Sequence, residues 1–120
     1  MATKSGSRAY VPERGDVVVL TFDPQVGHEQ SGRRPAVVLS PAIYNERSGL
    51  AVFAPITNQI KGYPFEVLIP AGHPVTGAVL ADQLKSLDWQ ARRARYISTL
   101  PAQVLQEVLR KTTALVAPAG

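Results

Sequence analysis

Cysteine is absent from this chain of 120 residues, which excludes disulfides, thiolate catalysis and zinc sites built on cysteine. Histidine is scarce as well, because His28 and His73 are the only two imidazoles in the sequence. Each lies in a stretch rich in glycine or proline, and nothing near either one indicates a shared site. We therefore expect neither a metal site nor a cofactor.

Long apolar runs are also absent, since no stretch approaches the roughly 18 apolar residues that a membrane-spanning helix needs. The first residues, MATKSGSRA, do not form a charged and then apolar leader. We therefore expect no membrane association and a cytoplasmic location. The 45% of apolar residues is typical of a globular chain. We expect a disordered N-terminal tail over residues 1–9 and a single domain over 10–117.

Nucleotide and acyl-transfer motifs are missing too: the chain contains no GxxxxGK(S/T) phosphate loop and no GxSxG elbow. What the chain does have is an excess of positive charge, with 13 lysines and arginines against nine acidic residues and a net charge of +4. A basic balance favours phosphate-bearing partners or acidic protein segments. Many basic proteins bind neither, so the charge alone does not decide.

Short β-branched and apolar runs bounded by glycine and proline predict strands. They cover residues 16–22, 35–40, 50–57, 65–69 and 95–98, and a longer apolar stretch over 78–89 is expected to cross the core. Pro35 has no backbone donor and should open its strand, while Pro55 should mark an edge or a bulge.

Helical signals appear twice. Residues 41–48 predict one or two turns, with Ser40 as N-cap and Gly49 as the stop. From Pro101 onward, apolar residues at Val104, Leu105, Val108 and Leu109 put one stripe on a helix that ends before Pro118. The predicted fold is therefore mainly β (α+β): a small, strongly bent antiparallel sheet or barrel of five to seven strands with a C-terminal helix.

Two arginines at the mouth of a predicted strand are the first candidates for chemistry. Arg33 and Arg34 precede Pro35, and a guanidinium offers a planar fork of donors that suits phosphate oxygens. The alternative is a surface salt bridge to Glu29 or Glu46. Glu29 itself, in a loop with glycines on both sides, is a candidate general base or arginine partner, or simply a solvated carboxylate.

Polar residues after two other strands form the second group of candidates. Thr57 ends a strand and can donate its hydroxyl to a phosphate or cap a turn. Lys61, Tyr63 and Phe65 mix a cation with rings, as single-stranded nucleic-acid sites do, although Phe65 in the core and Lys61 in solvent is the ordinary alternative. Asp82 either pairs with an arginine or lies on a solvent face.

Read together, three motifs resemble the MazF/PemK family of toxin–antitoxin endoribonucleases. They are GxEQxGxRPAVVLS, TxQxKGYPFEV and LADQxKS, in that order, within a similarity that runs from Tyr10 to Val116. The resemblance implies an SH3-like barrel with a C-terminal helix that works as a homodimer. It also implies metal-independent cleavage of single-stranded mRNA, with 2′,3′-cyclic phosphate and 5′-hydroxyl ends, and hence growth arrest.

The resemblance also implies roles for particular residues and partners. The arginine of the family's RP dipeptide falls on Arg34, its strand-end threonine on Thr57, and the glutamate of its EQ dipeptide on Glu29. Arg34 is then a transition-state clamp and proton donor, and Glu29 the candidate base. An antitoxin with an acidic flexible segment blocks the basic groove and binds DNA as part of the complex. The expected RNA-binding residues are Asn45, Asn58, Gln59, Lys61, Tyr63, Gln83, Lys85 and Ser86.

Three rival hypotheses stay open. A related toxin family uses a similar barrel to trap DNA gyrase, and fold alone does not separate the two. A noncatalytic RNA-binding barrel would bind RNA with a steep salt dependence and leave it intact. A ribonuclease built on His28 and His73 is the third.

Overall fold

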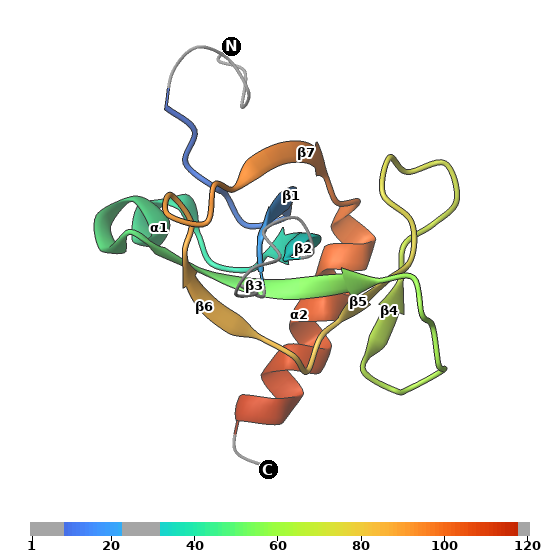
Figure 1. Ribbon diagram of the computed structural model, residues 1–120. Coiled ribbons are helices and arrows are strands. Elements are labelled where there is room, and N and C mark those ends of the chain that lie inside the picture. The colour runs from blue at the N-terminus through green and yellow to red at the C-terminus, as the bar shows by residue number, and fades with distance from the viewer. Residues whose placement is uncertain (1–8, 23–31, 118–120) are drawn as a thin grey trace.

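A computed structural model describes residues 9–22 and 32–117, which contain seven strands and two helices (Figure 1). The tail expected over residues 1–9 therefore lies outside the described residues, apart from Ala9. Neither helix in the described ranges is long and apolar enough to span a membrane. The elements in chain order are β1 (Asp16–Thr21), β2 (Arg33–Val38), α1 (Ala42–Ser48), β3 (Leu50–Thr57), β4 (Glu66–Leu68), β5 (Ala78–Leu80), β6 (Lys85–Asp88), β7 (Arg95–Thr99) and α2 (Ala102–Val116).

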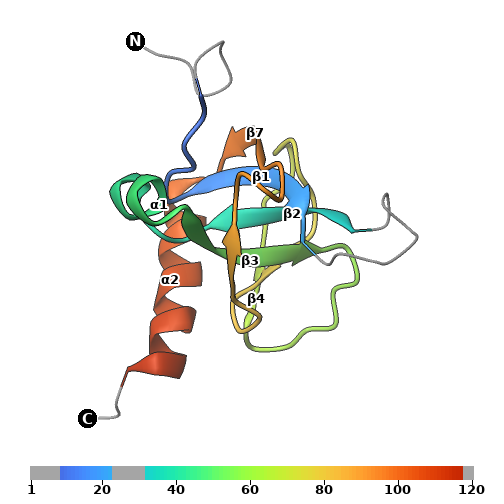
Figure 2. The same ribbon diagram turned by 60° about the vertical axis from the view of Figure 1, so that its left-hand side comes forward.

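The seven strands form one antiparallel sheet in the order β4-β5-β3-β2-β1-β7, with β6 added beside β3. β3 is the central strand, because β2 lies on one side of it and β6 and then β5 lie on the other (Figure 1). Figure 2 shows the end of β1, the start of β2 and the end of β3 on the side of the sheet away from α2. The prediction of a mainly β fold with a C-terminal helix is confirmed.

Two apolar clusters form the core, and alternate residues of β1 feed one and then the other. Val17 belongs to the first cluster and Val18 to the second, as the period of two along a strand requires. α2 closes the first cluster with Val108, which is fully buried, and its neighbouring stripe residues pack there too. Burying each such side chain contributes about 1.5–3 kcal/mol, so the predicted apolar stripe of α2 fixes this helix to the sheet.

Of the two strand prolines, Pro35 does not lie where expected, whereas Pro55 does. β2 begins at Arg33, so Pro35 lies inside the strand opposite Val19 instead of opening it. Pro55 is in the central strand and pairs with Ala36 of β2 on one side. On the other side it has no paired residue in β5 or β6. β6 pairs with residues 50–53 of β3, and β5 pairs from Ile56 onward. A residue without an N–H is tolerated at this change of partner.

The stretch 78–89 is not one strand. It divides into β5 and β6, and both pair with β3, joined by a turn over residues 81–84 in which Asp82 is exposed. Leu84 is the apolar residue of that turn that still packs against the first core cluster. Asp82 thus takes the solvent alternative, because the chain leaves its pairing with β3 at this turn and resumes it at Lys85 in the same direction.

The start of α1 also differs from the prediction. Pro41 is the N-cap and makes no side-chain cap bond, whereas the Ser40 hydroxyl donates to Asn45 Oδ1 at 2.6 Å. The Glu13 carboxylate accepts the Ala42 N–H at 2.9 Å instead, so a residue distant in sequence supplies the cap. Gly49 ends the helix in the left-handed region at φ 76°, as predicted.

Candidate active site

The register of β2 and β3 brings Arg34 and Thr57 to the same end of the sheet. The last paired residues of these strands are Ala36 and Pro55. Two further steps along each antiparallel strand lead to Arg34 on one and Thr57 on the other. Both side chains are half-buried. The sheet therefore carries Arg34 and Thr57, which are 23 positions apart in the sequence, at the same end and on the same face.

A phenylalanine supports the cations at this end. The guanidinium carbon of Arg34 lies 5.6 Å from the ring centroid of Phe22, and the Lys85 ammonium lies 5.0 Å from the same centroid. Phe22 is almost fully buried, so its ring is a fixed surface. A cation–π contact contributes about 0.5–2 kcal/mol. Two cations against one ring make this face attractive to anions. Sequence reasoning assigned Phe22 only to a strand.

The hydroxyl of Thr57 is oriented by its own turn. Its oxygen accepts the Gln59 N–H at 3.0 Å. A hydroxyl that accepts one bond still has its proton to donate, so Thr57 can donate to an incoming phosphate oxygen. Gly77 packs against the same backbone: a Cβ there would lie 2.2 Å from the Thr57 carbonyl oxygen, and Gly77 has a φ of 118°. Sequence reasoning read Gly77 only as a turn signal.

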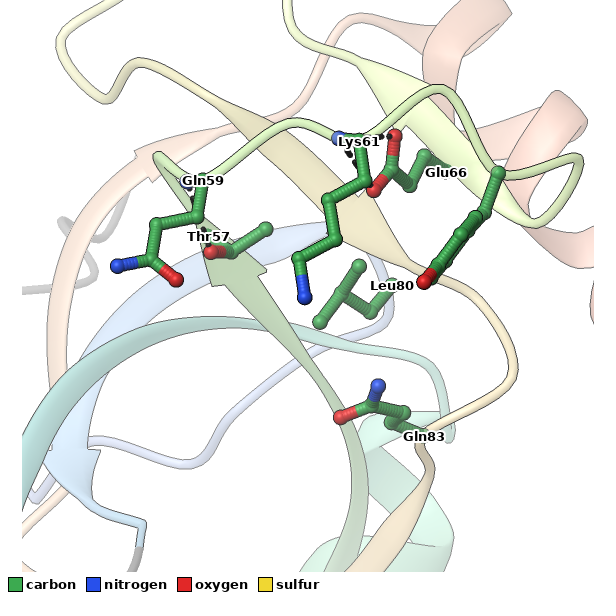
Figure 3. A pocket seen from close by; sticks show the side chains of 7 residues that line it. Thr57, Gln59, Lys61, Glu66, Leu80 and Gln83 are labelled. Atoms are coloured by element: carbon green, nitrogen blue, oxygen red, sulfur yellow. Dashed lines mark hydrogen bonds between the residues drawn. The ribbon is translucent and has the colours of Figure 1, made fainter.

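Beside Thr57 lies a pocket of about 170 Å³. In Figure 3 the Lys61 side chain extends from its loop into the space between Thr57 and Leu80. The Lys61 ammonium is 6.0 Å from the ring centroid of Tyr63. The pocket thus gathers four of the predicted RNA-binding residues with Thr57; its lining is Thr57, Gln59, Lys61, Tyr63, Glu66, Leu80 and Gln83.

Glu66 holds the loop that carries the pocket's cation and ring. Its carboxylate accepts the Lys61 N–H at 3.2 and 3.1 Å (Figure 3). It also accepts the Gly62 N–H at 2.8 Å. The Glu66 N–H in turn donates to the Tyr63 carbonyl at 3.0 Å. The Glu66 carboxylate, which lines this pocket together with Lys61, therefore acts as a structural clamp for the loop. Sequence reasoning missed this role, although an acidic residue just after a KGYP turn was a usable signal.

The remaining predicted residues divide into two groups. Lys85 and Ser86 are exposed on β6, and Asn58 is exposed directly after Thr57, where its Oδ1 accepts the Thr76 hydroxyl at 3.0 Å. These positions are compatible with contacts to RNA. Glu29 lies outside the described residues, as does His28. His73 anchors its loop, because its Nδ1 accepts the Val75 N–H at 3.2 Å.

The prediction that Asn45 contacts RNA is wrong. Asn45 is fully buried in α1, and its Nδ2 donates to the Pro12 carbonyl at 2.8 Å and to the Ser40 carbonyl at 3.0 Å. Its Oδ1 accepts the Ser40 hydroxyl. All the polar atoms of this amide are therefore engaged within the protein. The sequence could not reveal this, because Pro12 is 33 residues away.

Known proteins share this architecture. Residues 13–116 match the family described as PemK-like, MazF-like toxin of type II toxin-antitoxin system. The endoribonuclease toxin MazF of Escherichia coli K12 is 47% identical over 107 residues, covering 89% of this chain and 96% of the relative. MazF from Deinococcus radiodurans superposes with a TM-score of 0.83 at 54% identity, covering 92% and 100% of the two chains.

A further crystal structure, of MazE–MazF from Deinococcus radiodurans, superposes with a TM-score of 0.82 at 48% identity and covers 92% and 100% of the two chains. The matched family spans more than half of the sequence. The class of protein is therefore settled by fold and sequence together. The chain belongs to the PemK/MazF family of toxins of type II toxin–antitoxin systems.

Proposed function

We propose that this chain is an endoribonuclease toxin, an mRNA interferase that cleaves single-stranded mRNA at a specific sequence and needs no metal. The observation that carries the proposal is the position of Arg34 opposite Thr57 at one end of the sheet, with the Lys61 pocket beside them. The names of the relatives support the same activity, since the Escherichia coli MazF and PemK proteins are both called endoribonucleases.

The proposed reaction is an in-line transfer at phosphorus. The 2′-oxygen forms a bond to the adjacent phosphorus as the bond to the 5′-oxygen breaks, which leaves a 2′,3′-cyclic phosphate and a 5′-hydroxyl. Negative charge grows on the non-bridging oxygens, where the Arg34 guanidinium and the Thr57 hydroxyl donate hydrogen bonds. Glu29 takes the 2′-proton, and Arg34 supplies a proton to the departing 5′-oxygen.

Sequence recognition is assigned to the pocket and to its continuation on β6. Tyr63 is 60% exposed and can stack on a base of the RNA. Lys61 would contact the phosphate backbone of the RNA. The amides of Asn58, Gln59 and Gln83 offer donors and acceptors to base edges, and Lys85 and Ser86 extend the surface along β6.

The proposal includes partners and a location. An antitoxin with an acidic flexible segment would occupy the same cations, which the family name and the MazE–MazF structure support. A homodimer is the proposed active form. The toxin would act in the cytoplasm, where mRNA is translated.

Cleavage of a long single-stranded RNA by the purified protein in excess EDTA tests the proposal. Discrete cuts with cyclic-phosphate ends, strongly reduced in Thr57→Ala, are the expected result. Intact RNA from well-folded protein would refute the nuclease. Tight and salt-sensitive RNA binding without cuts would then favour the noncatalytic barrel, and binding to gyrase would favour the poison of the same fold.

A further inference from the structure

Arginines from three elements meet beside the end of β1. Arg33 begins β2, Arg95 begins β7, and Arg92 and Arg93 lie in the turn between β6 and β7. Arg33 Nη1 donates to the Arg92 carbonyl at 3.1 Å. Arg92 Nη1 donates to the carbonyls of Thr21 and Phe22, both at 3.0 Å. The turn is therefore fixed against the same Phe22 whose ring carries Arg34 and Lys85.

The charges in this cluster repel one another. Burial lowers the pKa of the Arg33 guanidinium, and the positive charges of Arg93 and Arg95 lower it further. Within residues 9–22 and 32–117, no carboxylate forms an ion pair with Arg93 or Arg95. Arg33 and Arg92 donate to backbone carbonyls, which carry no net charge, so the positive charge of the cluster stays unbalanced and attracts an anion.

Arg93 carries a second cost. It is the one non-glycine residue with a positive φ in the described part of the chain, at 58°. An L-residue in this left-handed region is strained unless it is asparagine, aspartate or glycine. The turn holds the backbone in this region, because the Arg93 N–H donates to the Gln90 carbonyl and the Ala94 N–H to the Trp89 carbonyl, both at 3.0 Å. The turn thereby fixes the point from which the exposed Arg93 side chain leaves the surface.

An aromatic pocket adjoins Arg93. Its lining comes from the N-terminal segment and the same turn: Ala9, Tyr10, Trp89, Gln90, Arg93 and Ala94. Trp89 is only 7% exposed and forms the floor of the pocket, whereas Tyr10 is half-buried. Both are held rigidly, because Trp89 Nε1 donates to the Asn45 carbonyl at 2.9 Å and the Tyr10 hydroxyl donates to Asp16 Oδ2 at 2.5 Å. Trp89 belongs to the second core cluster together with Phe22, and Tyr10 and Ala94 pack against it. The second core cluster therefore lies beneath both this pocket and the cations that contact Phe22.

Rings, a guanidinium and a side-chain amide are the groups that bind single-stranded nucleic acid. We propose that the pocket formed by Tyr10, Trp89 and Arg93 binds a phosphate and a base of single-stranded RNA outside the segment held at Thr57. This inference rests on the proposed RNA substrate. An acidic peptide would satisfy Arg93 and Arg95 but would leave the rings and Gln90 unused, so RNA is the better match.

Trp89 is the only tryptophan of the chain and therefore reports on this pocket directly. The probes are a long and a short 2′-deoxy single strand, which lack the attacking hydroxyl and cannot be cut by the proposed reaction. We expect the long strand to change the Trp89 fluorescence and the short strand, held at the Lys61 pocket, to leave it unchanged. A response to a polyglutamate peptide but to neither strand would overturn the assignment to RNA.

The decisive variant is Arg93→Asn, because asparagine accepts the left-handed backbone and removes the charge. It should keep or raise the urea midpoint of unfolding and weaken long-strand binding about fivefold, with a slope of log K against log salt shallower by about 0.7. Arg47→Gln, an exposed residue of α1, removes the same charge and should keep the wild-type slope. Equal affinities and slopes for Arg93→Asn and the wild-type chain would refute the site.

The failure of this inference is distinguishable from failure of the proposed function. Cleavage of RNA without any Trp89 response to the long strand would remove the second pocket and leave the nuclease intact. A Trp89 response to a deoxy strand without cleavage of RNA would leave the pocket standing and remove the nuclease.

Discussion

Polar residues lie beside both ends of β3, but they are buried at one end and open to solvent at the other. At its first residues, the Ser40 hydroxyl accepts the Val52 N–H, and Asn45 completes a buried network with Pro12. At its last residues, Thr57, Gln59 and Lys61 face an open pocket. A polar group that is buried must find its partner within the protein. A polar group kept exposed at a fixed backbone position is available to a ligand, and this difference separates structural from functional residues here.

Replacing Arg34 by alanine tests the open end with the largest expected effect. We expect the cleavage rate to fall by about a hundredfold or more, because one preorganised donor to the transition state is lost. The free energy of unfolding should fall by about 0.5–2 kcal/mol, because the contact of Arg34 with the Phe22 ring is lost. Arg34→Lys should be intermediate, because it keeps the charge and loses the planar fork. Full activity in Arg34→Ala would move the reaction elsewhere.

Asn45→Ala tests the closed end. Three internal hydrogen bonds disappear, and buried groups of Pro12 and Ser40 lose their partner. We expect the free energy of unfolding to fall by about 3 kcal/mol, measured by urea titration, while the folded fraction cleaves RNA at the wild-type rate. The opposite pattern, with normal stability and lost cleavage, would restore Asn45 to the substrate site.

Glu66→Gln sharpens the comparison, because it separates loop geometry from charge. The variant loses an acceptor of the Lys61 and Gly62 N–H groups, so the loop carrying Tyr63 loosens. We expect KM for RNA to rise severalfold even though the net charge becomes more positive. Glu46→Gln on α1 changes the net charge equally and serves as the matched control. A lower KM in both variants would show that charge alone matters.

Tyr10→Phe has the smallest expected effect, which is a change in how the free energy of unfolding depends on pH in alkaline solution. Burial and the hydrogen bond to Asp16 raise the pKa of the Tyr10 hydroxyl above its ordinary value of 10.0. Above about pH 10 the unfolded chain loses this proton while the folded chain keeps it, so stability falls as the pH rises. We expect a shallower fall in Tyr10→Phe, measured by urea unfolding from pH 8 to 11. Parallel curves would contradict this linkage.

Much of the fold was predictable because strand and helix signals are local. The β1 strand was predicted from its β-branched apolar run and the stripe of α2 from its side-chain spacing, and residues of both now pack in the core clusters. The break at residues 81–84 was not predictable, because apolar Leu84 hid a turn in which the chain changes its position along β3. Pro35 misled for the same reason, because whether an N–H is needed depends on a partner strand.

By itself, the sequence determined the family, through three motifs in fixed order, and nominated Arg34, Thr57 and the Lys61 loop. Only the tertiary structure decided that register sets Arg34 opposite Thr57, that Phe22 supports two cations, and that Asn45 is buried. It also joined the β6–β7 turn to the start of β2 through Arg33. Residue spacing fixes the direction of a side chain within its own element, whereas its neighbours are set by pairings between distant segments.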